Sequence, residues 1–117
     1  MPRTNMPNPA SVDTPTSSAA RTTSGTGTAL TGYGKVTAMR CQLNVTAASG
    51  TSPTLDVVIE DTLDGTNWNT VGTFTQATGA TRQVINISAP FGDTVRTRWT
   101  IGGTSPSFTF AVIIYTQ

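Results

Sequence analysis

Three closely spaced carboxylates are the residues of this sequence best suited to chemistry. Glu60, Asp61 and Asp64 lie just before Gly65, and paired carboxylates can bind Ca²⁺ or act as general acid and base. However, the alternating spacing of a calcium-binding loop is absent. Glu60 and Asp61 should also face opposite sides of a strand because they are adjacent in the chain. We therefore interpret the cluster as turn-forming and predict no metal site.

Histidine is absent from the chain, and Cys41 is its one cysteine. This composition excludes Ser-His-Asp catalysis, Cys-His catalysis and histidine-ligated metal sites. A single cysteine cannot form an internal disulfide, and the place of Cys41 on an apolar strand face predicts a buried, unreactive thiol. The glycine-rich stretch 25–34 lacks the lysine and the helix of a phosphate-binding loop. We expect no catalytic residue, no cofactor and no enzymatic activity.

The chain carries little charge. Charged residues make up 11% of its 117 residues and the net charge is +1, whereas an ordinary globular protein has roughly 25% charged residues. So weak a field gives no reason to expect binding to nucleic acid or to an anionic membrane. No apolar run approaches the roughly 20 residues of a membrane span. The length favours a single domain.

Apolar and polar residues alternate along most of the chain, which is the pattern of β-strands. The pattern predicts about seven strands, a short one at 29–33 and longer ones at 36–47, 54–62, 68–75, 82–89, 94–101 and 107–116. No stretch has the apolar spacing of a helix. We therefore predict an all-β fold, either an antiparallel β-sandwich or a jelly-roll-like barrel. Side chains expected in its core include Met39, Cys41, Leu43, Val45, Trp68, Phe74 and Trp99.

A short internal repeat lies between predicted strands. The tetrapeptide Gly-Thr-Ser-Pro occurs at 50–53 and again at 103–106, each time followed by alternating apolar residues. Proline interrupts a strand ladder and glycine tolerates positive φ, so each copy predicts a hairpin of the same shape. The paired loops form either a contact surface at equivalent ends of the two halves or a repeat of turn chemistry alone.

The first 28 residues differ from the rest of the chain. They are rich in proline, threonine and serine, and their only large apolar side chains are Met1, Met6 and Val12. Such a segment buries too little apolar area to offset its ordering entropy. We predict an extended or disordered N-terminal arm at 1–28 and a sandwich domain at 29–117. The arm is either a mobile tail or a segment that orders on a neighbouring subunit.

Several residues are candidates for contacts with partners. Arg82, Arg96 and Arg98 would form a small basic stripe for an acidic partner if they share one solvent face. Ile113 and Tyr115 place apolar groups on the second face of the last strand. Tyr33, Trp68, Trp99 and Tyr115 could together line a sugar-binding platform, although the tryptophans suit the core better. The predicted interface residues are Met6, Val12, Arg21, Arg96, Arg98, Ile113 and Tyr115.

Two stretches of the sequence resemble the small β-sandwich structural proteins of tailed bacteriophages, such as head decoration and other accessory virion proteins. The resemblance covers about residues 36–115 and leaves the arm outside. The stretches are Leu55-x-Val57-x-Ile59-Glu60-x-Thr62-x-Asp64-Gly65-x-x-Trp68 and Val95-Arg96-x-Arg98-Trp99-x-Ile101-x-Gly103-Thr104-Ser105-Pro106-Ser107-Phe108-Thr109-Phe110.

The resemblance implies a non-enzymatic virion protein made in the host cytoplasm. It would be a capsid decoration protein on the capsid exterior that binds the major capsid protein, associates with itself as a homotrimer and stabilises the shell. One alternative is a tail or connector protein of the same fold. Another is a fibre component whose β-sandwich binds host glycans, with Tyr33 and Tyr115 as an exposed aromatic pair.

Overall fold

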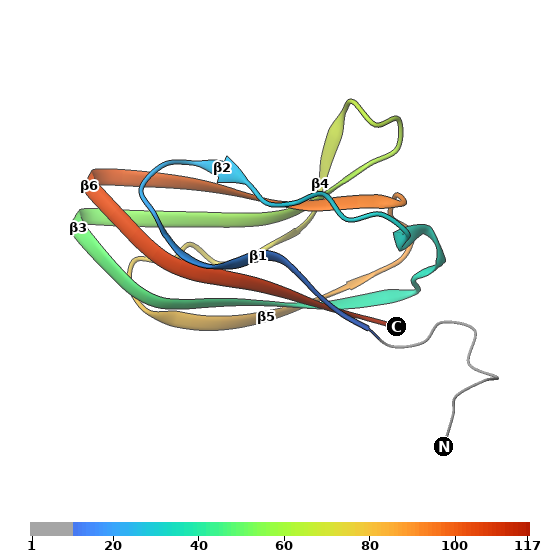
Figure 1. Cartoon of the computed structure of the whole chain (residues 1–117), viewed down its shortest axis with the longest axis horizontal. Coiled ribbons are helices and arrows are strands. Elements are labelled where there is room, and N and C mark those ends of the chain that lie inside the picture. Colours follow the sequence, from blue (N-terminus) through green and yellow to red (C-terminus); the bar gives the residue numbers. More distant parts are fainter. Residues whose placement is uncertain (1–10) are drawn as a thin grey trace, which may run out of the picture.

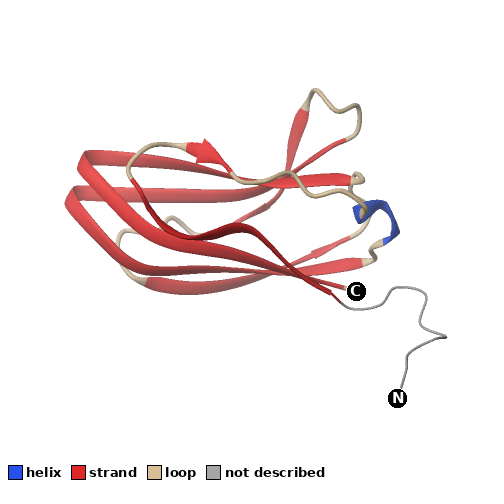
Figure 2. Ribbon diagram, viewed as in Figure 1, coloured by secondary structure: helices blue, strands red, loops and turns tan. Residues whose placement is uncertain are grey.

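The computed structural model describes residues 11–117 and is built almost entirely of strands (Figure 2). The short strand predicted at 29–33 is reduced to an isolated bridge between Leu30 and Val95, and a 3₁₀ turn, η1 (Tyr33–Lys35), follows it. The strands are β1 (Ser11–Arg21), β2 (Gly25–Thr26), β3 (Ala38–Thr62), β4 (Trp68–Thr73), β5 (Thr81–Ser88) and β6 (Thr94–Thr116).

Two very long strands organise the molecule. β3 and β6 pair antiparallel from Met39 opposite Thr116 to Thr62 opposite Thr94, and both bend over at the same end of the molecule (Figure 1). The N-terminal half of β3 and the C-terminal half of β6 form the first sheet with β1 and β5. The other two halves form the second sheet with β2 and β4. The predicted antiparallel β-sandwich is confirmed, and four of the predicted strands are the halves of β3 and β6.

The repeated tetrapeptide makes the two bends. Gly50 and Gly103 have φ values of 109° and 111°, and Ser52 and Ser105 both have φ of 48°. A Cβ atom on Gly50 would lie 2.7 Å from the carbonyl oxygen of Ser105, and one on Gly103 would lie 2.7 Å from that of Ser52. The prediction of two separate hairpins is therefore wrong. The chain passes from one sheet to the other without reversing its pairing, and the two corners pack against each other.

The core lies between the two sheets and follows the predicted alternation. Trp99 and Phe110 meet edge to face in it, with ring centroids 5.5 Å apart. Burial raises the pKa of the Cys41 thiol to about 12. Trp68 departs from the prediction, since it is only partly buried. Residues with no exposed surface include Cys41, Leu43, Leu55, Val57, Ile59, Val95, Phe108, Phe110, Val112 and Ile114.

The predicted arm is corrected for residues 11–28, which belong to the sandwich. β1 pairs with the C-terminal half of β6, and β2 pairs with its N-terminal half. The hydroxyls of Thr16 and Thr97 form a buried hydrogen bond of 2.6 Å. The prediction considered apolar area alone, whereas an edge strand is held mainly by its backbone hydrogen bonds. The predicted contact residue Met6 lies outside the described residues.

Candidate interaction faces

Exposed apolar side chains gather on the outside of the first sheet, which we call the first outer face. Val12 lies opposite Tyr115, and Tyr115 lies opposite Arg40 on the other side of β6. Ile113, Gln42 and Val84 form the neighbouring row across β6, β3 and β5. Cross-strand partners share a face of the sheet, so the face spans all four strands.

Three of the four exposed large apolar residues in the described part of the chain lie on this face. Val12 is 63% exposed, Val84 43% and Tyr115 41%, and Leu63 lies elsewhere. Such a concentration of apolar groups is typical of a surface that contacts another molecule. Two of the predicted interface residues, Val12 and Tyr115, are thus cross-strand neighbours.

A shallow groove crosses the first outer face. It has a volume of about 250 Å³ and is lined by Arg40, Gln42, Val84, Ile113 and Tyr115. Arg40 donates a hydrogen bond of 3.1 Å to the side-chain oxygen of Asn86, which holds its guanidinium along the sheet. The groove therefore combines an aromatic ring and aliphatic groups with polar side chains at its rim, the composition of a protein contact surface.

The outside of the second sheet, the second outer face, carries an ion-pair cluster. The Nε atoms of Arg96 and Arg98 donate to the two carboxylate oxygens of Glu60 at 3.0 and 2.9 Å. The guanidinium carbon of Arg96 lies 3.9 Å from the centre of the Trp68 ring. Burial alone would raise the pKa of the Glu60 carboxyl, but hydrogen bonds from the two arginines lower it below its ordinary value.

The predicted basic stripe is only partly formed. Arg96 and Arg98 share the second outer face, but Arg82 lies on β5 opposite Asn44 in the first sheet. The three arginines therefore do not share one surface. The two Gly-Thr-Ser-Pro bends that carry β3 and β6 between sheets separate them.

Arg21, one of the predicted interface residues, contacts side chains and backbone of this same chain. Its guanidinium lies 5.0 Å from the centre of the Trp99 ring and 4.7 Å from that of Phe110. It also donates to the carbonyl oxygens of Ser17, Ala19 and Phe110. Its position at the end of β1 thus fastens that strand over the core.

The predicted aromatic platform is not assembled. Tyr33 is 3% exposed and its hydroxyl donates to Asp13 at 2.6 Å, so the expected exposed pair of Tyr33 and Tyr115 is wrong. Trp99 is 8% exposed, and its indole nitrogen donates to the carbonyl oxygen of Thr23. Of the aromatic candidates, Tyr115 is the one most accessible to a ligand.

Each carboxylate of the 60–64 cluster has its own structural partner. Asp64 accepts backbone hydrogen bonds from Thr66 and Asn67, which lower the pKa of its carboxyl. Asp61 accepts a hydrogen bond of 2.6 Å from the backbone of Gly92. Within residues 11–117, no three potential metal ligands come together. The interpretation of Asp64 as a turn residue is confirmed.

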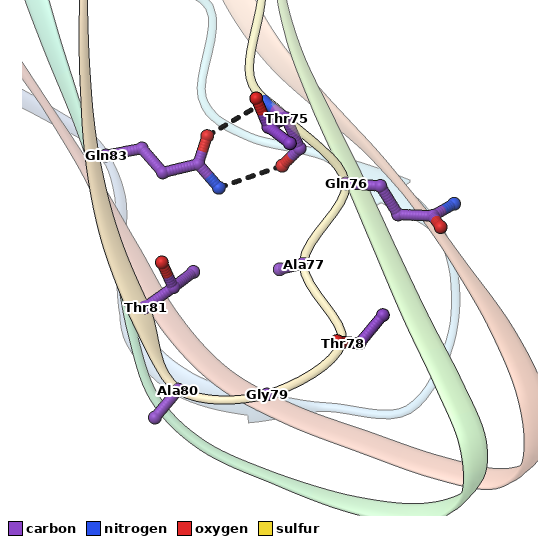
Figure 3. Close-up of a pocket in the computed structure, with 8 residues that line it drawn as sticks. All are labelled: Thr75, Gln76, Ala77, Thr78, Gly79, Ala80, Thr81 and Gln83. Atoms are coloured by element: carbon purple, nitrogen blue, oxygen red, sulfur yellow. Dashed lines mark hydrogen bonds between the residues drawn. The ribbon is translucent and has the colours of Figure 1, made fainter.

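Another hollow lies beside the loop between β4 and β5. It has a volume of about 420 Å³ and is lined by residues 75–81 and Gln83 (Figure 3). The Gln83 side chain bonds both the backbone nitrogen and the carbonyl oxygen of Thr75, at 2.8 Å each. The lining is neutral and contains no aromatic ring.

Over the described residues, no helix is long and apolar enough to span a membrane.

Sequence reasoning missed several members of both faces. Alternation placed Arg40 and Gln42 outward, but it could not show that they lie beside Tyr115 because strand pairing is not written in the pattern. Trp68 was expected in the core, although it supports Arg96 on the outside. The position of Trp68 just after a turn gives only a weak indication that it contacts an arginine. The contact with Arg96 can be identified only once the strand register is known.

Comparisons with known proteins identify the fold. No protein-family model and no curated protein sequence matches the chain. The solved structure of the PBSX exported protein XepA superposes with a TM-score of 0.64 at 13% identity, over 91% of this chain and 36% of XepA. This chain thus spans about a third of the length of XepA.

Two further solved structures match over nearly their whole length. The SPBc2 prophage-derived protein YomS has a TM-score of 0.52 at 9% identity, with 92% of this chain and 94% of YomS covered. The CBM36-1 domain of a multidomain xylanase from the hindgut metagenome of Trinervitermes trinervoides has a TM-score of 0.55 at 12% identity, with coverage of 92% and 96%. The resemblance to phage β-sandwich proteins is therefore confirmed as a likeness of fold: this chain has the β-sandwich found in phage-derived proteins and in a carbohydrate-binding module.

Proposed function

We propose that this chain is a non-enzymatic structural protein of a phage particle that decorates the outside of the head shell and stabilises it. It would be made in the host cytoplasm and would bind the major capsid protein. We also propose that it associates with itself into a trimer. The exposed apolar side chains of the first outer face carry the proposal. The sandwich fold shared with PBSX XepA and the prophage-derived YomS supports it.

The proposed mechanism is the burial of the first outer face against shell subunits. Burial of apolar surface contributes roughly 25 cal/mol per Å², and the low charge of this chain keeps the desolvation cost of a lateral contact small. Because the protein binds the assembled shell and not its separated subunits, it shifts the equilibrium toward the intact particle.

The test compares two single variants on shells of the phage that encodes this chain, assembled without it. Tyr115→Asp places a charge in the centre of the first outer face, and we expect occupancy on the shell to fall at least about tenfold. Leu63→Asp changes an 80% exposed residue away from this face, so its occupancy should equal that of the wild type. Equal occupancy of the two variants would contradict the proposal.

A glycan-binding role is the second candidate, and the groove at Tyr115 favours it. An exposed aromatic ring beside Arg40 and Gln42 can stack on a sugar and bond its hydroxyls, and a carbohydrate-binding module shares the fold. Glycan-array binding that is lost in Tyr115→Ala, together with no binding to the shell, would favour this function over decoration.

A further inference from the structure

We propose that Arg96 and Arg98 form a binding site for a single carboxylate of an acidic segment in a partner protein. The site lies on the second outer face, away from Tyr115, and the inference does not depend on the proposed function. It uses Glu60 and Trp68 as positioning residues and leaves the two guanidinium groups to bind the ligand.

Glu60 engages only the Nε atom of each arginine side chain. Each guanidinium donates to the carboxylate through its Nε atom. Among residues 11–117, no hydrogen bond uses the terminal nitrogens of either side chain. The side chains of Arg96 and Arg98 are 24% and 42% exposed, whereas that of Glu60 is 6% exposed. The buried carboxylate therefore orients two guanidinium groups whose remaining donors are available at the surface.

Trp68 restricts the position of Arg96 further. The guanidinium stacks on the indole at 3.9 Å, a contact that favours a flat guanidinium. A side chain held in one place loses less conformational entropy when a ligand binds. The stack and the ion pair together preorganise the donors.

The charge of the cluster selects the ligand. Two arginines and one glutamate leave one net positive charge, which matches one carboxylate. Asp56 is the other acidic residue on the same face of β3, and its carboxylate oxygens accept hydrogen bonds from Gln76 at 3.0 and 3.2 Å. A polyanion is disfavoured because its attraction depends on many cations, and this chain has a net charge of only +1.

The chemistry of the donors agrees with a carboxylate. A planar guanidinium fork matches the two oxygens of a carboxylate and forms charge-assisted hydrogen bonds, which are stronger than neutral ones. The cross-strand neighbours of Arg98 are neutral, namely Val58 on β3 and Thr26 on β2. An acidic side chain presented by a partner can therefore approach Arg98 between neutral side chains, while the Asp56 carboxylate is hydrogen-bonded to Gln76.

The experiment titrates the full chain with a short peptide that has an amidated C-terminus and contains one glutamate as its sole carboxylate, and it follows the arginine Nε–H and tryptophan indole signals by NMR. The same peptide with glutamine in place of glutamate is the ligand control. We expect saturable shifts at Arg96, Arg98 and Trp68 with the glutamate peptide only. Arg98→Gln should weaken binding about tenfold, as expected for loss of a hydrogen bond to a charged group. Arg98→Lys should restore part of the affinity.

Arg82→Gln is the matched protein control because Arg82 is an exposed arginine of the first sheet. It should leave the shifts unchanged. Urea denaturation of each variant checks that the fold is retained. Equal shifts with the two peptides, or full binding by Arg98→Gln, would overturn the proposal. Tighter binding of inorganic phosphate at the same signals would overturn the assignment of the ligand as a carboxylate.

Discussion

At the scale of single residues, the buried hydroxyl pair between Thr16 and Thr97 supports the attachment of β1. Thr97 has no exposed surface, and its hydroxyl lies 2.6 Å from that of Thr16. Thr97→Val should destabilise the protein by about 1–3 kcal/mol because it leaves the Thr16 hydroxyl buried without its partner. The double variant Thr16→Val/Thr97→Val removes both polar groups and should be less destabilised than Thr97→Val. Urea unfolding curves measure both, and a double variant that is the less stable one would contradict this account.

Glu60 gives a pH-dependent contribution to stability. The arginines lower the pKa of its carboxyl in the folded protein, so the contribution is fully present above the ordinary value of 4.5 and is lost as the pH falls through the lower, folded value. We expect Glu60→Gln to be less stable than the wild type at pH 7, and the difference to shrink at pH 3. Because Asp64 and Asp93 are present in both proteins, the comparison isolates Glu60. A difference that does not change with pH would rule out this role.

At the scale of elements, the two Gly-Thr-Ser-Pro corners determine whether β3 and β6 can cross between sheets. Gly50→Ala and Gly103→Ala each add a Cβ 2.7 Å from a backbone oxygen of the other corner and force an unfavourable φ. Each should destabilise the protein by at least about 2 kcal/mol. Gly79→Ala is the control, because a Cβ there meets nothing within 4 Å. Urea denaturation measures all three, and corners that tolerate alanine as well as Gly79 does would show that their close packing is not required.

The corners also show how far the sequence alone predicts this fold. Alternation identifies the inward residues of both long strands, such as Leu43 and Phe110, because one buried face imposes a period of two. It cannot show that pairing continues through a proline-containing segment, so each long strand was predicted as two. β1 escaped prediction because its stability comes from backbone hydrogen bonds, Thr16 and Arg21, none of which leaves an apolar pattern. The apolar part of the first outer face was predictable at Val12, Ile113 and Tyr115, whereas no direction was predicted for Val84, since Val84 and Ile85 are adjacent apolar residues.

β1 also covers a sheet edge. It pairs with β6 from Thr116 to Phe108, and an uncovered strand edge tends to pair with another chain. A variant that begins at residue 22 should therefore associate or precipitate where the full chain stays soluble. Sedimentation of the two chains at equal concentration measures this, with Arg21→Ala as a milder variant that keeps the strand. A truncated chain that remains folded and associates no further than the full chain would show that β6 does not need this cover.

At the scale of the whole molecule, the sandwich presents two outer faces of different chemistry, one with exposed apolar side chains and one with the ion-pair cluster of Glu60, Arg96 and Arg98. The faces belong to different sheets, so a change on one should not alter the other, and free-energy changes of distant sites add to within about 0.5 kcal/mol. If the proposed decoration protein uses both faces on the particle, Tyr115→Asp and Arg98→Gln should each lower its affinity for the shell, and the double variant should lose the sum. Equilibrium binding of the four proteins to shells assembled without the chain measures this. If the double variant binds the shell as well as Tyr115→Asp alone, the arginine site does not contact the shell. Its carboxylate ligand would then belong to a different partner protein.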